Sequence, residues 1–303
     1  MKRSTVGTLL GILSIFFWST TIAFGRRLTE SVGILSATST AFLISGILTC
    51  CFWSLHHRSP TALFRYRRSY LTVCGGLFAL YVICLYGAIG ASTSRQQVFE
   101  VGIINYLWPA LILVFSVPVL RVRARPTLWL GILLAMSGAV LALAQQGELS
   151  WTAWQRHVAA QPLPYVLAFV GAIAWALYSN LSRRLGPGAG IGGQPLFVLG
   201  TGILLLFLRM AVHESPRWTP EALALLAYNI VFPITLAYAF WDYAVRTGRI
   251  VLLASLSYMT PVLSTGVSAV LLQMAPGTTL WVACALVIAG AGICKMSVQE
   301  GRD

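Results

Sequence analysis

Residues able to do acid–base or metal chemistry are scarce in this sequence. Aspartate occurs only at Asp242 and, in the C-terminal tail, at Asp303, whereas an aspartyl protease needs two facing carboxylates. The six cysteines include no Cys-x-x-Cys pair, so neither a zinc site nor a disulfide framework is indicated. We therefore expect no enzyme, no catalytic residue, no metal site and no cofactor. The four histidines, which lie in or beside hydrophilic connections and offer no Ser–His site, are His56, His57, His157 and His213.

Glu100 is the ionisable residue that most suggests a site. It follows Arg95 by five residues, near one end of an apolar segment. An ionisable side chain within a membrane span is a functional candidate. A carboxylate near a helix N-terminus is also stabilised by the amides there without any further role, and both interpretations stay open. Asp242 differs, because Arg246 lies four residues later and can pair with it on one helix face.

Aromatic residues recur at related positions in the two halves of the chain. Helical spacing places Trp18 on one face with Ser14 and Thr21. Such residues often only pack or sit at a lipid interface. Trp18 and Trp175, however, lie about two turns from their predicted helix ends, where an indole N–H needs a polar partner that an internal cavity would supply. The predicted substrate-binding set is Trp18, Tyr81, Glu100, Asn105, Tyr106, Trp108, Trp175, Tyr178, Tyr238 and Tyr258.

Pro109 and Pro261 fall in the middle of long apolar segments. Proline removes a helical N–H and so frees the carbonyl four residues earlier, here on Asn105 and Ser257. Freed carbonyls could receive a substrate ammonium while neighbouring aromatic faces stack on its ring. The alternative is a kink whose carbonyls are satisfied by Ser or Thr hydroxyls. We predict that both prolines act as hinges.

The composition is that of a membrane protein. Hydrophobic residues make up 57% of the 303 and charged residues 10%, against roughly a quarter charged in soluble domains. A helix needs about 20 apolar residues to cross a bilayer. The segments of that kind predict ten helical spans, at residues 4–25, 32–55, 69–90, 97–120, 127–145, 163–182, 195–212, 221–245, 250–273 and 278–297.

Basic residues cluster between these segments. Of the 21 Lys and Arg residues, fifteen lie on the side that holds both termini and six on the other. Because positive charge stays cytoplasmic, both termini are expected inside, and the +13 net charge needs no nucleic acid partner. The connection 146–162 holds two tryptophans and predicts an amphipathic stretch at the outer interface. The connection 188–193 fits G-x-G-x-x-G but follows no strand, so we interpret it as a flexible linker.

The two halves of the chain repeat one another. The interval of eight residues from Trp18 to an Arg-Arg-Leu triplet recurs after Trp175, and Tyr106-x-x-Pro109 recurs as Tyr258-x-x-Pro261. Five spans per half force the halves into opposite orientations. Inverted repeats are the architecture of secondary transporters, with the substrate near the bilayer midplane. We therefore predict two inverted five-helix repeats, 1–147 and 148–303, around a central cavity.

The chain resembles the drug/metabolite transporter superfamily, in particular its EamA-type ten-helix members and, among these, exporters of aromatic amino acids. The segments that carry the resemblance are Phe17-Trp18-Ser19-Thr20, Glu100 to Pro109, Ala174-Trp175-Ala176-Leu177-Tyr178 and Ser257 to Ser264. The resemblance implies a basket of helices around a central cavity and export from the cytoplasm.

We accordingly expect an exporter of aromatic amino acids, and of related hydrophobic ones, in the bacterial inner membrane. No ATP-binding motif occurs, and membrane acids are few, which favours uncoupled transport over a proton relay. Its partners would be the small-molecule substrate and the lipid bilayer, with the protein as a monomer. The alternatives are a broad drug or metabolite exporter and a non-transporting membrane scaffold, which would need no cavity.

Overall fold

The computed structural model describes residues 2–56, 61–144, 150–188, 190, 192–271 and 278–299. Nearly all of this chain is helical. Two-residue strands β1 (Arg123–Ala124) and β2 (Val298–Gln299) pair antiparallel. The helices are α1 (Arg3–Val32), α2 (Ile34–His56), η1 (Ala62–Arg65), η2 (Tyr70–Cys74), α3 (Gly75–Ala91), α4 (Arg95–Asn105), α5 (Trp108–Leu120), α6 (Thr127–Leu143), α7 (Trp151–Ala160), α8 (Leu163–Leu185), α9 (Gln194–Met210), α10 (Pro220–Asn229), η3 (Ile230–Leu236), α11 (Ala237–Thr247), α12 (Ile250–Ser257), α13 (Met259–Leu271) and α14 (Thr278–Ser297).

The expectation of an all-α, multi-span membrane protein is confirmed. In the described part of the chain, seven helical segments are long and apolar enough to cross a membrane. An eighth combines α12 and α13, which meet at a 44° bend. Helices α6 and α9 are apolar but shorter, with 17 residues each.

Helix α1 extends further than predicted. The sequence indicated an end near residue 25, whereas the helix continues to Val32. Gly33 ends it with a positive φ of 93°, a conformation that costs glycine little, and donates its N–H to the Thr29 carbonyl. Residues 26–32 contain no glycine or proline, and the helix continues to Gly33, the next glycine after Gly25.

The chain divides into two compact units. One unit contains residues 1–83 and 181–249, and the other contains 84–180 and 250–303. We call them unit 1 and unit 2. Each unit draws helices from both halves of the sequence. Two of the three divisions fall within α3 and α8, and the third falls between α11 and α12. The two units are described separately below.

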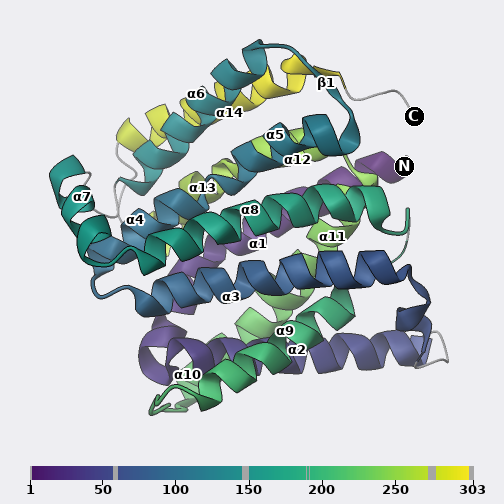
Figure 1. Ribbon diagram of the computed structural model, residues 1–303. Helices are drawn as coiled ribbons and strands as arrows, with labels where there is room; N and C mark the ends of the chain where they lie inside the picture. The colour runs from purple at the N-terminus through teal and green to yellow at the C-terminus, as the bar shows by residue number, and fades with distance from the viewer. Residues whose placement is uncertain are drawn as a thin grey trace. The chain divides into compact units, whose positions relative to one another are not determined.

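Small residues let the helices of unit 1 approach closely. Helices α2 and α9 lie side by side (Figure 1), and a Cβ on Gly46 or Gly202 would collide with the partner backbone. Gly7 of α1 lies equally close to Gly248, at the end of α11. Gly7 belongs to a Gly7-x-x-x-Gly11 spacing, and small residues at this spacing favour close approach of helices.

Glu214 fastens the start of α2. Its carboxylate accepts hydrogen bonds from the N–H groups of Leu35 (3.0 Å) and Ser36 (2.7 Å), and Arg209 lies 3.3 Å away. Burial alone would raise the pKa of this carboxyl, but the hydrogen bonds from Ser36 and Leu35 and the charge of Arg209 together lower it below the ordinary value of 4.5. The carboxylate therefore caps α2 from a segment far away in sequence.

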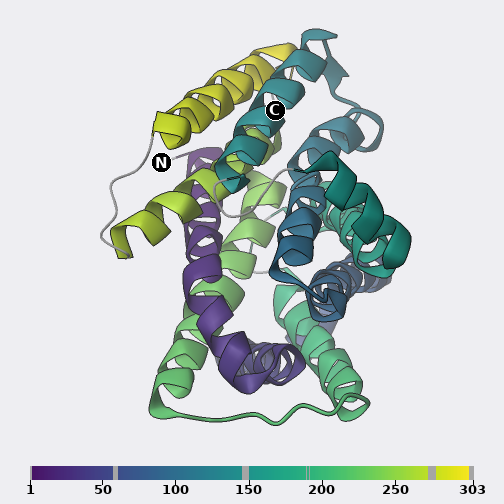
Figure 2. The same ribbon diagram turned by 90° about the vertical axis from the view of Figure 1, so that its left-hand side faces the viewer.

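In unit 2 the closest pair is α6 with α14, which lie side by side in Figures 1 and 2. Gly131 and Gly138 of α6 and Gly290 of α14 leave no room for a Cβ on the facing side. Backbones that meet at small residues gain van der Waals contact that lipid cannot replace. The outward faces of the same helices carry exposed Trp129 and Trp281.

Candidate functional site

Two interrupted helices of unit 2 carry the residues predicted as hinges. Helix α4 ends at Asn105, Tyr106 and Leu107 form a turn, and α5 begins at Trp108. Tyr258 likewise separates α12 from α13. Both breaks therefore coincide with the matched tyrosines of the sequence repeat.

The prolines begin the second half-helix at each break. Pro109 is in the first turn of α5 and Pro261 in the first turn of α13, where a missing N–H costs no hydrogen bond. At the first break the Tyr106 N–H donates to the Gly102 carbonyl (3.0 Å). Because Pro109 has no backbone N–H, the Asn105 carbonyl receives no hydrogen bond from residue 109. The helix is therefore interrupted just before the proline, whereas the sequence suggested a kink.

An aromatic seam joins α5 and α8 near the first break. The rings of Trp108 and Trp175 meet edge to face with centroids 6.4 Å apart, and Trp175 stacks on Tyr178 at 5.0 Å. About one turn further along the same two helices, the Asn180 amide donates to the carbonyl of Ile112 (3.1 Å). All these side chains are buried. The seam thus gathers three packed aromatic rings beside the first break, and rings of this kind can stack on an aromatic ligand where a ring face is uncovered.

Several buried oxygens beside the breaks lack a hydrogen bond among the described residues. They include the Oδ1 atoms of Asn105 and Asn180 and the Tyr258 hydroxyl. The Tyr258 hydroxyl lies next to the backbone of Ala110, in the first turn of α5, without ordinary hydrogen-bond geometry. Amide oxygens only accept, and a buried acceptor without a donor costs free energy. The set is therefore suited to a ligand that donates hydrogen bonds.

The aromatic residues predicted in unit 1 form a second cluster. Trp18 of α1 contacts Tyr238 and Trp241 of α11, with ring centroids 5.4 Å apart in both pairs. Tyr238 meets Phe78 of α3 edge to face at 4.9 Å. The Trp18 indole N–H donates to the Pro233 carbonyl (3.2 Å). This polar partner is a backbone group, whereas the sequence suggested that a cavity would supply the partner. Tyr81, on α3, is also buried in this unit.

Glu100 lies in a third group of residues, at the end of unit 2 that holds α7. The buried carboxylate accepts a hydrogen bond of 2.5 Å from the Tyr165 hydroxyl. The His157 Nδ1 lies 3.0 and 3.2 Å from its two oxygens, and the Gln96 amide is 3.4 Å away. Sequence reasoning missed His157 and Tyr165, which are 57 and 65 residues from Glu100. The one available signal was that a buried acid requires partners.

Asp242 and Arg246 form the predicted ion pair, at 2.8 Å. Arg246 also donates to the carbonyls of Pro187 (2.6 Å) and Gly190 (2.7 Å). In the 188–193 connection, Gly190 is therefore tied to α11, while Ala189 and Ile191 lie outside the described residues. The interpretation of this connection as a flexible linker stays a prediction. Burial raises the pKa of nearby Tyr66, opposed by the charge of Arg246.

Position 192 in this connection requires glycine. Its φ is +68°, and a Cβ there would meet the Asp242 carboxylate and the Tyr70 hydroxyl. Tyr70 in turn accepts a hydrogen bond from the Gly193 N–H (3.1 Å).

Among the described residues, no group of three or more His, Cys, Asp or Glu side chains could hold a metal ion.

A multi-span helical protein with matched helix breaks in its two sequence halves has the features of a secondary transporter. The model of the EamA-like transporter family matches this chain twice, over residues 5–144 and 162–294. The chain therefore belongs to the EamA-like transporter family. As predicted, it is a transporter-family protein and not an enzyme.

Its similar relatives include three bacterial proteins named aromatic amino acid exporter YddG. The one from Escherichia coli K12 is 29% identical over 97% of this chain and 98% of its own length. Those from Salmonella typhimurium 14028s and Ancylobacter novellus are 30% and 31% identical, over at least 98% of each chain. One solved structure superposes with a TM-score of 0.80 at 27% identity, covering 97% of this chain and 99% of that one. The predicted resemblance is confirmed.

Proposed function

We propose that this protein exports aromatic amino acids across the bacterial inner membrane. The observation that carries the proposal is the pair of interrupted helices, each with a tyrosine in the break and a proline starting the next half-helix. Interrupted helices in inverted repeats form the substrate sites of many secondary transporters. Full-length relatives named as exporters of aromatic amino acids support the substrate class.

The architecture that we propose has ten spans in two inverted repeats, 1–147 and 148–303, with both termini cytoplasmic. The two family matches, 5–144 and 162–294, support the repeat. Helices α6 and α9 are the two spans that fall short of the usual length, and they occupy the predicted fifth and seventh positions. A 17-residue helix can cross where the bilayer thins locally. We propose that the protein functions as a monomer.

The substrate ring would stack on the aromatic seam of Trp108, Trp175 and Tyr178. The ammonium would donate to acceptors at the first break, the Asn105 carbonyl and the Asn105 side-chain oxygen. Asn105 and Tyr106 keep part of their surface accessible, unlike the seam itself. Export requires that the site open to each side in turn, and the half-helices provide segments that can pivot at the breaks.

Transport of radiolabelled Phe and Trp into proteoliposomes tests the proposal. Trp175→Ala removes a seam ring worth about 0.5–1.5 kcal/mol beyond area burial, so apparent affinity should fall several-fold. Trp129→Ala is the matched control, because Trp129 is exposed on α6 in the same unit. Equal uptake of Phe and an unrelated cationic drug would favour a broad exporter. No uptake of any solute, with protein folded in the membrane, would favour a scaffold and refute the proposal.

A further inference from the structure

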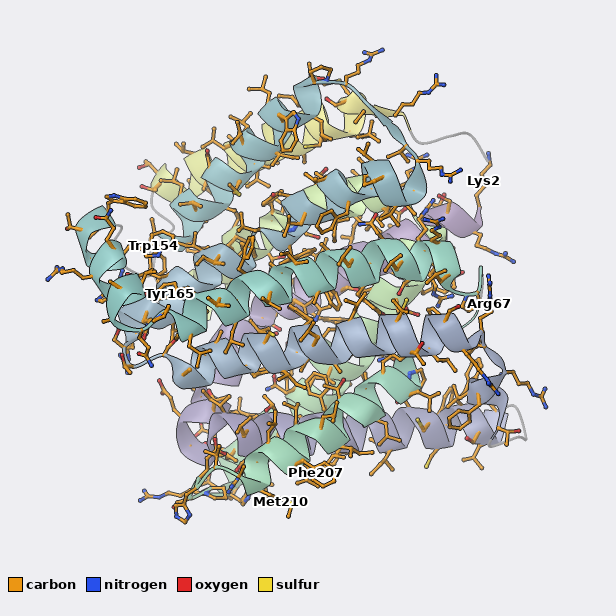
Figure 3. The ribbon with its side chains drawn as sticks, in the orientation of Figure 1. Lys2, Arg67, Trp154, Tyr165, Phe207 and Met210 are labelled. Atoms are coloured by element: carbon orange, nitrogen blue, oxygen red, sulfur yellow. The ribbon has the colours of Figure 1, made fainter. Side chains whose placement is uncertain are left out.

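The Glu100 group ties three helices of unit 2 together. Glu100 lies on α4, His157 on α7 and Tyr165 at the start of α8. Figure 3 shows Trp154 of α7 beside Tyr165, and Trp154 packs against the small cluster to which Tyr165 belongs. The Gln161 amide, between α7 and α8, adds a hydrogen bond of 2.9 Å to the Ala91 carbonyl of α3. The carboxylate is thus the polar centre of the docking site for α7.

The hydrogen-bond roles at this centre follow from the chemistry of the groups. An ionised carboxylate only accepts, so the Tyr165 hydroxyl and the His157 Nδ1 must both act as donors. Glu100 is 2% exposed, whereas the His157 side chain is 37% exposed. Of these two side chains, the imidazole is therefore the one in contact with water. A proton taken up by His157 turns this hydrogen bond, from a neutral donor to a charged acceptor, into an ion pair in which both partners are charged.

The position of α4 makes this contact relevant to transport. Glu100 is in the middle of α4, and the helix ends at the break five residues later. Since α4 is separated from α5 by the turn at Tyr106 and Leu107, it can pivot only if its other contacts allow it. The hydrogen bonds of Glu100 hold α4 to α7 and α8. They would have to break, or α7 would have to move along with α4, whenever α4 pivots.

We propose that Tyr165 and His157 are positioning residues for export: they hold Glu100, and with it the half-helix α4, and protonation of His157 tightens this hold. The inference rests on the proposed function and on its orientation, which places α7 on the outer side. Acid on that side then slows the pivot of α4, so turnover falls while the affinity at the break is unchanged.

The charges around the site leave few other groups to titrate. On the parts of α3, α4, α7 and α8 that belong to unit 2, the other ionisable side chains are Arg95, Arg156, Cys84, Tyr86, Tyr165 and Tyr178. A cysteine ordinarily ionises only near pH 8.5. Arginine stays protonated, and tyrosine stays neutral, through the range from about pH 5 to 8 in which an ordinary imidazole changes charge. His157 is therefore the residue expected to set the pH profile.

Initial rates of Phe transport at pH 5 to 8 on the α7 side, with the other side held constant, test the inference. Wild-type turnover should fall several-fold toward pH 5 with an unchanged KM. His157→Gln keeps an amide donor without the titration, so its profile should be flat. His213→Gln, on the exposed connection after α9, is the matched control and should keep the wild-type profile. Tyr165→Phe should raise turnover at acid pH.

A His157→Gln profile identical to that of wild type, or an effect on KM in place of turnover, would overturn the inference and leave the proposed function intact. Hydrogen exchange of the α7 amides gives a readout that needs no transport. At pH 5 these amides should exchange faster in His157→Gln than in wild type. If that difference appears but no protein transports Phe, the anchor stands and the proposed function fails. Equal exchange in the two proteins would refute the anchor itself.

Discussion

Removing the charge of Asp242 is the change with the most predictable consequence in unit 1. The side chains of Asp242 and Arg246 are 0% and 1% exposed, and the guanidinium donates to Oδ2 through both Nε (3.0 Å) and Nη2 (2.8 Å). Asp242→Asn keeps the shape of the side chain but leaves Arg246 as a buried charge. The carbonyls of Pro187, Gly190 and residue 242 itself remain as its acceptors.

The size of the loss follows from these contacts. Removing one partner of a buried ion pair typically costs 3–5 kcal/mol, because the remaining charge stays uncompensated. Since three carbonyls still accept hydrogen bonds from the guanidinium, we expect the lower end, about 3 kcal/mol. The connection 186–193 should also become more mobile, because Asp242 no longer orients the Arg246 guanidinium that bonds to it.

Denaturant titration in mixed micelles, with helicity as the signal, measures the change in free energy of unfolding. Glu221→Gln is the matched control, because Glu221 pairs with Arg27 at 3.7 Å in the same unit with both side chains about 70% exposed. An exposed pair of this kind contributes about 0–1 kcal/mol. A loss below 1 kcal/mol in Asp242→Asn would show that the buried pair contributes no more than the exposed one, and would refute the reasoning.

Three further predictions concern orientation, acid stability and the hinges. A membrane-impermeant thiol reagent added outside cells should label Trp151→Cys and spare Arg123→Cys in a background without native cysteines; the reverse pattern would exclude the proposed topology. Because hydrogen bonds and Arg209 lower the pKa of Glu214, its contribution to stability is present above pH 4.5 and is lost as pH falls through the lowered value. Glu214→Gln should therefore be less stable than wild type at pH 7, with the difference vanishing in acid, as thermal unfolding at several pH values would show; a constant difference would contradict this. Pro109→Ala and Pro261→Ala should slow turnover while Trp binding survives, with opposite changes in cysteine accessibility; turnover and accessibility like those of wild type in both variants would mean that the prolines shape a static site.

The membrane-spanning character and the internal repeat were readable in the sequence because they depend on local composition. A helix in lipid satisfies its own backbone, so a run of apolar residues is enough to predict it. The matched Tyr-x-x-Pro motifs also located both helix breaks, because proline and the residues before it are conformationally restricted by their own chemistry. The end of α1 was misplaced, since two consecutive arginines looked like a connection although they continue a helix readily.

The partners of the polar residues depended on tertiary structure. The sequence identified Glu100 as a candidate, but its hydrogen bonds to His157 and Tyr165 arise only where α7 and α8 pack on α4. The Asp242–Arg246 pair was predictable, since its partners lie one helical turn apart, whereas the carbonyls of Pro187 and Gly190 were not. Glu214 capping α2 is a third case. Local spacing specifies which groups share a helix face, but desolvation makes each buried polar group require a partner, and the packing of distant segments decides which partner it finds.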